Sequence, residues 1–257
     1  MLLKIKKERF FLKYNLKFIS DKDLFEHVKE TVLKYRFKIN LKQFNKNIID
    51  PIKLTFDSKV YKKTLEDVIE SEILRQKDKS NNNQIGYFNQ NIFKYIGKGW
   101  QVPSQGFDIV NYEKKIYVEM KNKHNTMNSS SSQKTYIQMQ NKILKQPDAT
   151  CMLVEVISKK SQNIEWKVSV NNKQASHKQI RRVSIDKFYE LVTGDKNSFR
   201  DLCQVLPKVI DDVLEKVSLN KDQNTVFKEL KAISPNLFKS IFLLSFKKYE
   251  GFNEFNI

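Results

Sequence analysis

A short apolar hairpin with charged side chains on one face is the feature that most constrains the fold of this chain. Residues 106–121 read GFDIVNYEKKIYVEMK, which predicts two strands joined by a polar turn. Side chains alternate between the faces of a strand, so Glu119 and Lys121 point one way while the apolar side chains at 116, 118 and 120 point into a core. If the turn spans residues 111–114, Asp108 lies on the neighbouring strand near residues 117–119. The hairpin therefore predicts two carboxylates and a lysine gathered at one point.

Two carboxylates at one point suit a hard divalent cation. Mg²⁺ prefers oxygen ligands and retains several waters, and hydrolysis of a phosphodiester needs an activated water and neutralised phosphoryl oxygens. We expect Asp108 and Glu119 to ligate Mg²⁺, with the backbone carbonyl of Met120 as a third ligand. Lys121 is expected to donate to the attacking water or to the phosphate, and its role as base or stabiliser stays open. The structural alternative is a surface ion pair between Glu119 and Lys121.

The E-x-K triplet alone is a weak signal because this lysine-rich chain contains four copies. They begin at Glu113, Glu119, Glu165 and Glu229. The first lies in the turn and the last in a helical pattern, where residues two apart diverge. The copy at Glu165 and Lys167, with Glu155 upstream, occupies an alternating strand and is the main competing site. We favour the Glu119 copy because the polar run NKHNTMNSSSSQK follows it and places hydrogen-bonding groups beside the expected metal.

The charge of the chain favours a polyanionic partner. Its 47 lysines and arginines against 29 acidic residues give a net charge of +18, which attracts phosphate backbones. Only six of the basic residues are arginine, so part of the excess is also typical of an AT-rich genome. No apolar run approaches the roughly 18 residues of a membrane span, and we expect a cytoplasmic protein. Cys151 and Cys203 lie in apolar segments without C-x-x-C spacing, so we expect buried free thiols.

The periodicity of the chain predicts an α/β fold. Helical spacing marks residues 21–36, 59–76 and 85–96, whereas residues 79–84 (KSNNNQ) are typical of a loop. Strands are expected at 100–102, in the hairpin, at 151–157 and at 164–170. The continuous apolar run at 151–157 is typical of a buried central strand. Further helices are expected from Ser132 to Pro147, from Ser184 to Gly194, at 198–217 with a kink or split at Pro207, and at 227–248.

No internal repeat or interdomain linker is visible, so we expect one domain over residues 1–257. Within it we expect a mainly helical N-terminal part at 1–84, a catalytic core at 85–207 and a helical C-terminal part at 208–257.

The hairpin resembles the core motif of the PD-(D/E)xK nuclease superfamily, with Asp108 followed by Glu119-Met120-Lys121. The longer runs GYFNQNIFKYIGKGW, VEMKNKHNTMNSSSSQKTY and RRVSIDKFYELVTG are similar to type II restriction endonucleases that cut GGNCC-type sites. This resemblance extends over about residues 85–207. Phe107 stands where the superfamily pattern has proline, which weakens the motif without removing a ligand.

The resemblance implies a restriction-endonuclease-like core, with a central mixed β-sheet flanked by helices and helical elaborations at both ends. It implies Mg²⁺-dependent double-strand cleavage of DNA with 5′-phosphate products, a homodimer on a palindromic site and a companion DNA methyltransferase. It also implies an acid from an upstream helix, for which Glu70 is the candidate and Glu66 fits nearly as well. A type II restriction endonuclease is therefore the expected function. The alternatives are a structure-selective repair or junction nuclease on the same core and a non-catalytic DNA-binding protein.

Two polar segments are expected to contact DNA. Arginine reads guanine well, and Arg181 and Arg182 lie in a polar stretch that we expect to form a loop. This loop contacts bases or phosphates, or it is simply solvated. The run after the hairpin is expected to contact DNA near the scissile bond. The expected DNA-binding residues are Lys123, His124, Asn125, Thr126, Asn128, Ser129, Ser130, Lys134, Arg181 and Arg182.

Overall fold

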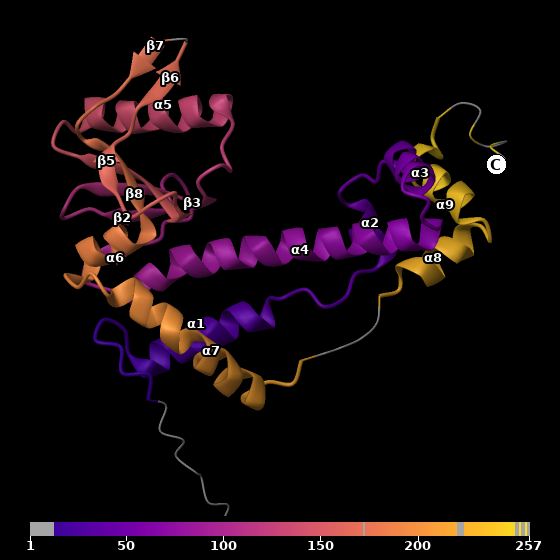
Figure 1. The fold of residues 1–257 in the computed structure, drawn as a ribbon, viewed down its shortest axis with the longest axis horizontal. Coiled ribbons are helices and arrows are strands. Elements are labelled where there is room, and N and C mark those ends of the chain that lie inside the picture. Colours follow the sequence, from indigo (N-terminus) through magenta and orange to yellow (C-terminus); the bar gives the residue numbers. More distant parts are fainter. Residues whose placement is uncertain (1–12, 172, 220–223, 250–251, 253–254, 256–257) are drawn as a thin grey trace, which may run out of the picture. The chain divides into compact units, whose positions relative to one another are not determined.

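The computed structural model describes residues 13–171, 173–219, 224–249, 252 and 255, and Figure 1 shows its ribbon. The chain divides into two compact units. Unit 1 comprises Met1–Val32 and Ile85–Val217, and unit 2 comprises Leu33–Gln84 and Ser218–Ile257. The expected start of the catalytic core at residue 85 coincides with a unit boundary. That one nuclease domain includes both units stays a prediction.

Unit 1 is built around a six-stranded mixed sheet, with the strand order β1-β2-β3-β4-β8-β5. The first three strands pair antiparallel, β3, β4 and β8 pair parallel, and β5 pairs antiparallel with β8. The strands are β1 (Trp100–Gln101), β2 (Ile109–Asn111), β3 (Ile116–Lys123), β4 (Thr150–Ile157), β5 (Asn163–Glu165) and β8 (Ile180–Ser184). Helices flank this sheet, so the expected α/β class is confirmed.

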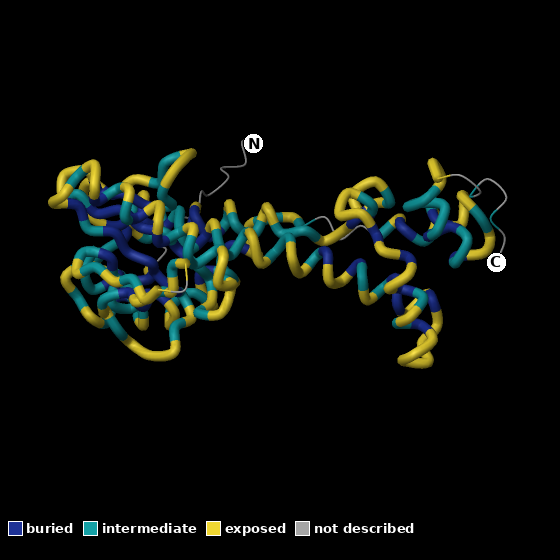
Figure 2. The backbone as a smooth tube through the Cα atoms, turned by 90° about the horizontal axis from the view of Figure 1, so that it is seen from above, coloured by how far each residue is buried: buried dark blue, intermediate teal, exposed yellow. Residues whose placement is uncertain are grey.

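Helices cover both faces of the sheet (Figure 1), and the buried residues of unit 1 lie in its interior (Figure 2). Helix α5 (Ser129–Lys145) packs on one face, together with the small sheet of β6 (Val168–Val170) and β7 (Lys173–Ala175). The other face is covered by four elements, α1 (Asp21–Leu33), η1 (Ile92–Lys94), α6 (Ile185–Thr193) and α7 (Ser198–Lys216). Strand β4 is therefore a buried central strand, as the sequence predicts.

The predicted hairpin forms from β2 and β3. Its turn closes where the Asn111 side chain accepts the Lys114 backbone N–H at 2.9 Å and Lys115 adopts a positive φ of 54°. Ile116, Val118 and Met120 point into the core opposite α5, with exposures of 9%, 0% and 5%. Burial of each such side chain contributes about 1.5–3 kcal/mol, which fixes the register of the strand.

The expected loop at residues 79–84 is wrong, because this segment lies inside α4 (Leu65–Asn91). Asparagine costs only about 0.7 kcal/mol relative to alanine in a helix, and no proline interrupts the segment. The Asn81 side chain also accepts the Arg36 backbone N–H at 2.8 Å, and the Asn82 amide donates to Asp78 at 2.8 Å. Buried apolar residues at both ends of α4 hold the helix on either side of this polar stretch.

Three other element boundaries differ from the sequence predictions. The helix expected from Lys59 begins at Leu65, because the Thr64 hydroxyl accepts the Asp67 N–H at 3.1 Å and caps α4 there. Helix α5 is capped by Asn128 instead of Ser132, since the Asn128 side chain accepts the Ser131 N–H at 2.8 Å. Helix α7 continues through Pro207 without splitting, because apolar residues on both sides of the proline are buried in the core.

The strand expected at 164–170 is also wrong, because two short strands of different sheets, β5 and β6, take its place. Trp166 lies between them, 3% exposed, and packs edge-on against Tyr136 of α5. Burial of this large side chain ends the alternation of the strand. Lys167 therefore lies outside both strands and does not alternate with Glu165.

The two cysteines differ in their surroundings. Both are free thiols, as expected, but only Cys151 is buried, whereas Cys203 is exposed on α7. The expectation that Cys203 is buried is wrong because the buried face of this amphipathic helix is formed by Leu202, Val209 and Val213. Burial raises the pKa of the Cys151 thiol to about 12.

Unit 2 is an all-helical cluster in the described residues. Its helices are α2 (Leu41–Asn45), α3 (Pro51–Val60), the first part of α4, α8 (Val226–Ile233) and α9 (Leu237–Phe246). Asp50 caps α3 and accepts the Lys53 N–H at 3.0 Å, and Pro51 occupies the first turn, where no N–H is needed. Across the described part of the chain, none of the helices is both long and apolar enough to cross a membrane.

Candidate active site

Asp108 lies directly before β2 and is tied to the neighbouring strand. Its Oδ2 accepts the backbone N–H of Met120 at 2.8 Å, and the antiparallel register that pairs Ile109 with Val118 places it beside Glu119. Within the described residues, the other carboxylate oxygen, Oδ1, has no protein partner. The predicted position of Asp108 on the hairpin is confirmed, with one oxygen anchored and one available to a ligand.

Glu119 and Lys121 point to the α5 face of the sheet and form an ion pair. The Lys121 Nζ lies 2.6 Å from Glu119 Oε1, and the side chains of Lys121 and Glu119 are 30% and 17% exposed. Their backbone is fixed by the parallel pairing of β3 with β4, in which Glu119 registers with Leu153. Lys121 is therefore the counter-ion of Glu119 at this end of the sheet.

The electrostatics of the site favour a bound cation. Burial raises the pKa of Asp108, and the nearby Glu119 carboxylate raises it further, whereas the Met120 N–H and Lys121 act in the opposite direction. The net shift of the pKa is upward, so keeping the Asp108 carboxylate ionised lowers the stability of the folded protein. A divalent cation between the two carboxylates would offset this loss of stability. Two carboxylates are enough protein ligands for Mg²⁺, because this ion keeps several of its waters. The donor set of Asp108, Glu119 and backbone oxygen fits Mg²⁺.

The expected helical acid lies in another part of the chain. Glu66 is exposed and Glu70 half-buried near the start of α4, and both belong to unit 2, whereas Asp108 and Glu119 belong to unit 1. In the described residues, no group of three or more His, Cys, Asp or Glu side chains is arranged to hold a metal ion. Ligation by Glu70 stays a prediction.

A pocket of about 460 Å³ beside Asp108 was not predicted from the sequence. The last part of α4 and the segment from Val102 to Asp108 line it. Its helical wall consists of Tyr87, Gln90, Asn91 and Lys94. These residues follow the i, i+3, i+4, i+7 spacing and so form a polar stripe along a helix whose other face is apolar. This stripe is the signal in the sequence from which the pocket could have been predicted.

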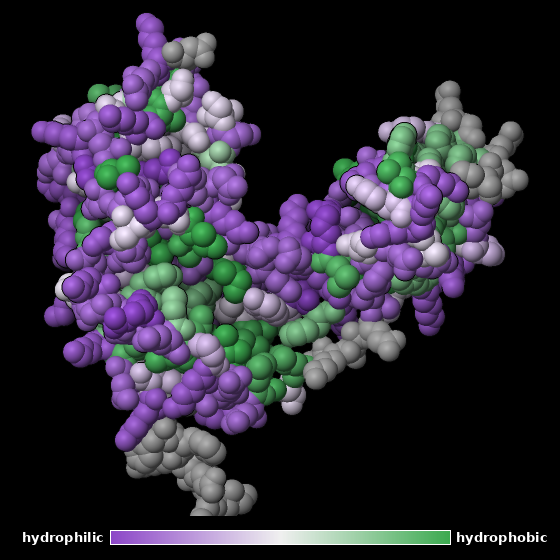
Figure 3. Space-filling view, in the orientation of Figure 1, coloured by the Kyte–Doolittle hydropathy of each residue, from purple (hydrophilic) through white to green (hydrophobic). Residues whose placement is uncertain are grey.

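Most of the predicted DNA-binding residues after β3 lie at the surface. Hydrophilic residues dominate the visible face of unit 1 (Figure 3). Thr126 donates to the Lys123 carbonyl at 2.8 Å and forms a turn, and the Asn128 side chain is occupied as the cap of α5. The exposed members of the set are Lys123, Asn125, Thr126, Asn128, Ser129, Ser130 and Lys134, whereas His124 is half-buried. The structure brings this segment to the end of the strand that carries Lys121.

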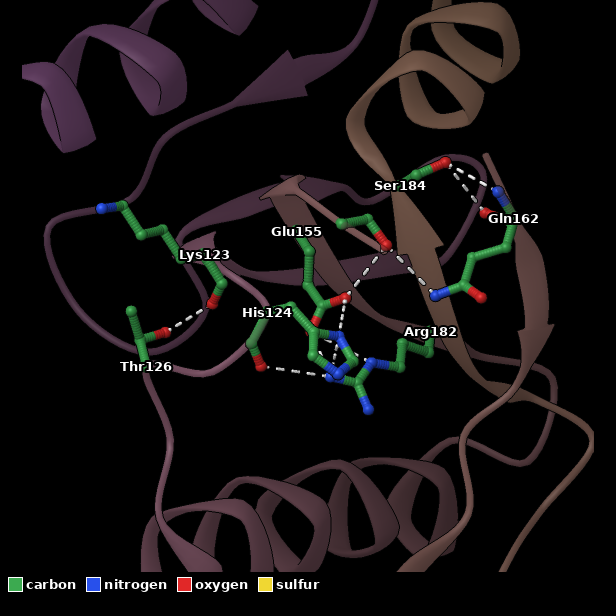
Figure 4. A network of polar contacts seen from close by, with 8 residues as sticks. Lys123, His124, Thr126, Glu155, Gln162, Arg182 and Ser184 are labelled. Atoms are coloured by element: carbon green, nitrogen blue, oxygen red, sulfur yellow. Dashed lines mark hydrogen bonds and ion pairs between the residues drawn. The ribbon is translucent and has the colours of Figure 1, made fainter. Parts of the chain in front are cut away.

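The two predicted arginines lie in strand β8, so their expected loop is wrong. Pairing of β8 with the buried strand β4 on one side and β5 on the other accounts for the strand. Arg182 contacts Glu155 and His124, whereas Arg181, within the part of the chain that the structure describes, bonds only to Asn163. Figure 4 shows the first group, which we call the Arg182 cluster: Glu155, Arg182 and His124.

The competing site at Glu155, Glu165 and Lys167 does not form a convergent group. Glu155 is buried at 0% exposure and bonded to Arg182, while Glu165 ends β5 and Lys167 is exposed between strands. A carboxylate neutralised in this way has no free charge for a metal. The Asp108 hairpin is therefore the candidate active site.

Comparison with known proteins agrees with this geometry. The family model of the Eco47II restriction endonuclease matches residues 16–215. The chain is 28% identical over 250 residues to the type II restriction enzyme Sau96I of Staphylococcus aureus, covering 91% of this chain and 96% of that enzyme. It is 29% identical over 212 residues to the type II restriction enzyme Eco47II of Escherichia coli, covering 77% and 88%. The chain belongs to the Eco47II restriction endonuclease family, and so to the type II site-specific deoxyribonucleases.

Proposed function

We propose that this protein makes Mg²⁺-dependent, sequence-specific double-strand cuts in DNA, with Asp108, Glu119 and Lys121 as its catalytic residues. The observation that carries the proposal is the hydrogen bond from Met120 N–H to Asp108, which holds both carboxylates and Lys121 at one end of β3. Two relatives named as type II restriction enzymes support it.

The ligands of the metal follow from this geometry. Asp108 Oδ1 and Glu119 Oε2, which have no hydrogen-bond partner among the described residues, would hold Mg²⁺. The N–H and C=O of one residue in a strand point to the same side, so the Met120 carbonyl is directed to the Asp108 side of β3 and would be a third ligand. Bound Mg²⁺ supplies an activated water and charge neutralisation at the phosphate.

Lys121 provides the second positive charge of the site. A metal ion held by Glu119 would replace the Lys121 ammonium as its counter-charge, and the Lys121 Nζ would then be able to donate to the phosphate oxygens or to the attacking water. Either role neutralises charge that develops in the transition state. Glu70 remains the proposed additional acid, with Glu66 as its alternative.

The finer parts of the proposal rest on family likeness. They are recognition of a GGNCC-type site, 5′-phosphate products, a homodimer matched to a palindromic site, and a companion methyltransferase that protects the same site in the cytoplasm. The net charge of +18 supports double-stranded DNA as the partner.

A digest of DNA of known sequence in Mg²⁺, followed by sequencing of the ends, tests the activity, the target and the cut position together. We expect discrete fragments that share one GGNCC-type sequence and carry 5′-phosphates. A smear, or cutting confined to branched DNA, would point to a repair or junction nuclease instead.

Asp108→Ala tests the assignment of the metal ligand. We expect cleavage to fall by at least about a thousandfold, because one of two carboxylate ligands is lost, while DNA binding in Ca²⁺ persists. Glu113→Ala, in the exposed turn of the same hairpin, is the matched control and should cleave normally. Undiminished cleavage by Asp108→Ala would place the active site elsewhere in the chain.

A further inference from the structure

A buried carboxylate organises an arginine and a histidine near the candidate active site. Glu155 is 1% exposed at its side chain, and Arg182 donates to it through Nε at 3.0 Å and through Nη2. The His124 Nδ1 lies 3.1 Å from Glu155 Oε2 and 2.7 Å from Arg182 Nη2. Arg182 also donates to the His124 backbone carbonyl at 3.3 Å. These contacts fix both side chains in one arrangement (Figure 4).

The cluster leaves hydrogen-bond donors without a protein partner. Arginine carries five N–H groups, and those on Nη1 of Arg182 make no hydrogen bond within the described residues. Figure 4 shows this third guanidinium nitrogen pointing away from Glu155. When the His124 Nδ1 accepts from Arg182, its contact with Glu155 Oε2 is not a hydrogen bond, and the ring proton lies on Nε2, a donor without a partner among the described residues. The side chains of Arg182 and His124 are 22% and 26% exposed, so a ligand can reach them.

The cluster lies on the same face of the sheet as Glu119 and Lys121. Glu119 registers with Leu153, and Leu153 registers with Arg182, so the three side chains stand in one row across β3, β4 and β8. Two strand spacings separate Glu119 from Arg182, which is about 10 Å. The donors of Arg182 would therefore lie opposite a phosphate other than the scissile phosphate at the proposed metal ligands.

We propose that Arg182, held by Glu155, and His124, held by Arg182, form a binding site for one non-scissile phosphodiester of the strand being cut. The proposal rests on the proposed function, because the phosphate is that of the DNA substrate. A planar guanidinium with fixed donors matches phosphate geometry, and the buried Glu155 prevents it from swinging away. Glu155 is then a positioning residue, since it acts through Arg182.

Arg181 provides a matched comparison on the same strand. It is adjacent in sequence and therefore points to the opposite face of β8. Its Nε and Nη2 donate to Asn163, and among the described residues it forms no ion pair with a carboxylate. A general effect of replacing a guanidinium by an ammonium would change the phosphate profile alike for the two arginines, whereas a built phosphate site would depend on Arg182 alone.

Methylphosphonate scanning tests the proposal. Each phosphate of a duplex that contains the cleavage site is replaced in turn by a neutral methylphosphonate, and the Kd is measured in Ca²⁺ for wild type, Arg182→Lys and Arg181→Lys. We expect one position near the cut to weaken wild-type binding by about 10- to 100-fold, the effect of losing hydrogen bonds to a charged group. Arg182→Lys should bind the unmodified duplex more weakly by a similar factor and be insensitive at that position. Arg181→Lys should keep the wild-type sensitivity at that position, whatever its Kd for the unmodified duplex.

Two outcomes would overturn the proposal: the same phosphate profile for Arg182→Lys and wild type, or loss of sensitivity at that position in both lysine variants. Arg182→Lys keeps a cation opposite Glu155. If it nevertheless unfolds at a lower temperature, the double variant Glu155→Gln/Arg182→Gln, which leaves no buried charge unpaired, is scanned instead. Wild-type digestion in Mg²⁺ is assayed separately, so failure of cleavage with an intact phosphate profile counts against the proposed function and not against this site.

Discussion

At the scale of single residues, Lys121 balances the charge of one acid of the candidate active site. Its Nζ contacts Glu119 at 2.6 Å, while among the described residues Asp108 has only the Met120 backbone N–H as its partner. The fold thus neutralises Glu119 with Lys121 but leaves Asp108 without a neutralising cation, which lowers the stability of the folded protein. A loss of stability of this kind is expected at a functional site, because the arrangement that activity requires is often not the most stable one.

This loss of stability predicts a pH-dependent gain in stability for Asp108→Asn. Folding raises the pKa of Asp108, so its stabilising contribution is present below the ordinary value of about 3.9 and is lost as the pH rises through the raised value. Each unit of the shift corresponds to about 1.4 kcal/mol. The substituted amide would keep an acceptor for the Met120 N–H without the charge. We expect Asp108→Asn to unfold at a higher temperature than wild type near pH 7, and the difference to shrink toward pH 4.

Thermal unfolding of wild type and variant across this pH range measures the effect. Glu113→Gln removes an exposed acid of the same hairpin and is the control, with an expected change within about 0.5 kcal/mol. A neutral-pH stability of Asp108→Asn below that of wild type would contradict the proposed loss of stability.

At the scale of elements, α4 and β8 show where local sequence and tertiary packing disagree. The hairpin, the central strand β4 and the amphipathic helices could be predicted because their buried residues are periodic. The segment at 79–84 could not, since its asparagines are typical of loops, while the helix is held by buried residues on either side of it. Strand β8 begins in a polar stretch, and only its pairing with β4 and β5 makes it a strand.

The candidate site was predictable in part for the same reason. Asp108, Glu119 and Lys121 lie within one hairpin, so strand alternation and a local turn are sufficient to bring them together. The Arg182 cluster joins three segments far apart in the chain, and no local pattern links Glu155 to Arg182. The pocket beside Asp108 likewise depends on where the end of α4 packs.

Substitutions at Asn83 test the helical state of the polar stretch in α4. Asn83 is exposed, so its effect on stability is expected to follow helix propensity. We expect Asn83→Ala to raise the free energy of unfolding by about 0.5 kcal/mol and Asn83→Pro to lower it by about 3 kcal/mol, measured by urea denaturation. Nearly equal stabilities for the two variants would mean that this stretch is a loop, as its composition suggests.

At the scale of the whole molecule, the net charge of +18 makes salt a strong control on DNA binding. A protein that neutralises six to ten phosphates loses about 10³- to 10⁵-fold in affinity between 50 and 200 mM salt. We expect a loss in this range for specific DNA, measured as the Kd in Ca²⁺ over a KCl series. A Kd that changes by less than about tenfold would show that few of the lysines contact phosphate.

The central position of β4 also has a consequence for the order in which the protein is synthesised. Strand β3, which carries Glu119 and Lys121, pairs with β4, and β4 in turn needs β8 on its other side. A nascent chain that ends before Ile180 lacks β8, and without Arg182 the buried Glu155 has no arginine to neutralise it. The sheet that supports the candidate active site is therefore completed only after Ser184 has been synthesised. Chains that stop before β8 are expected not to cut DNA.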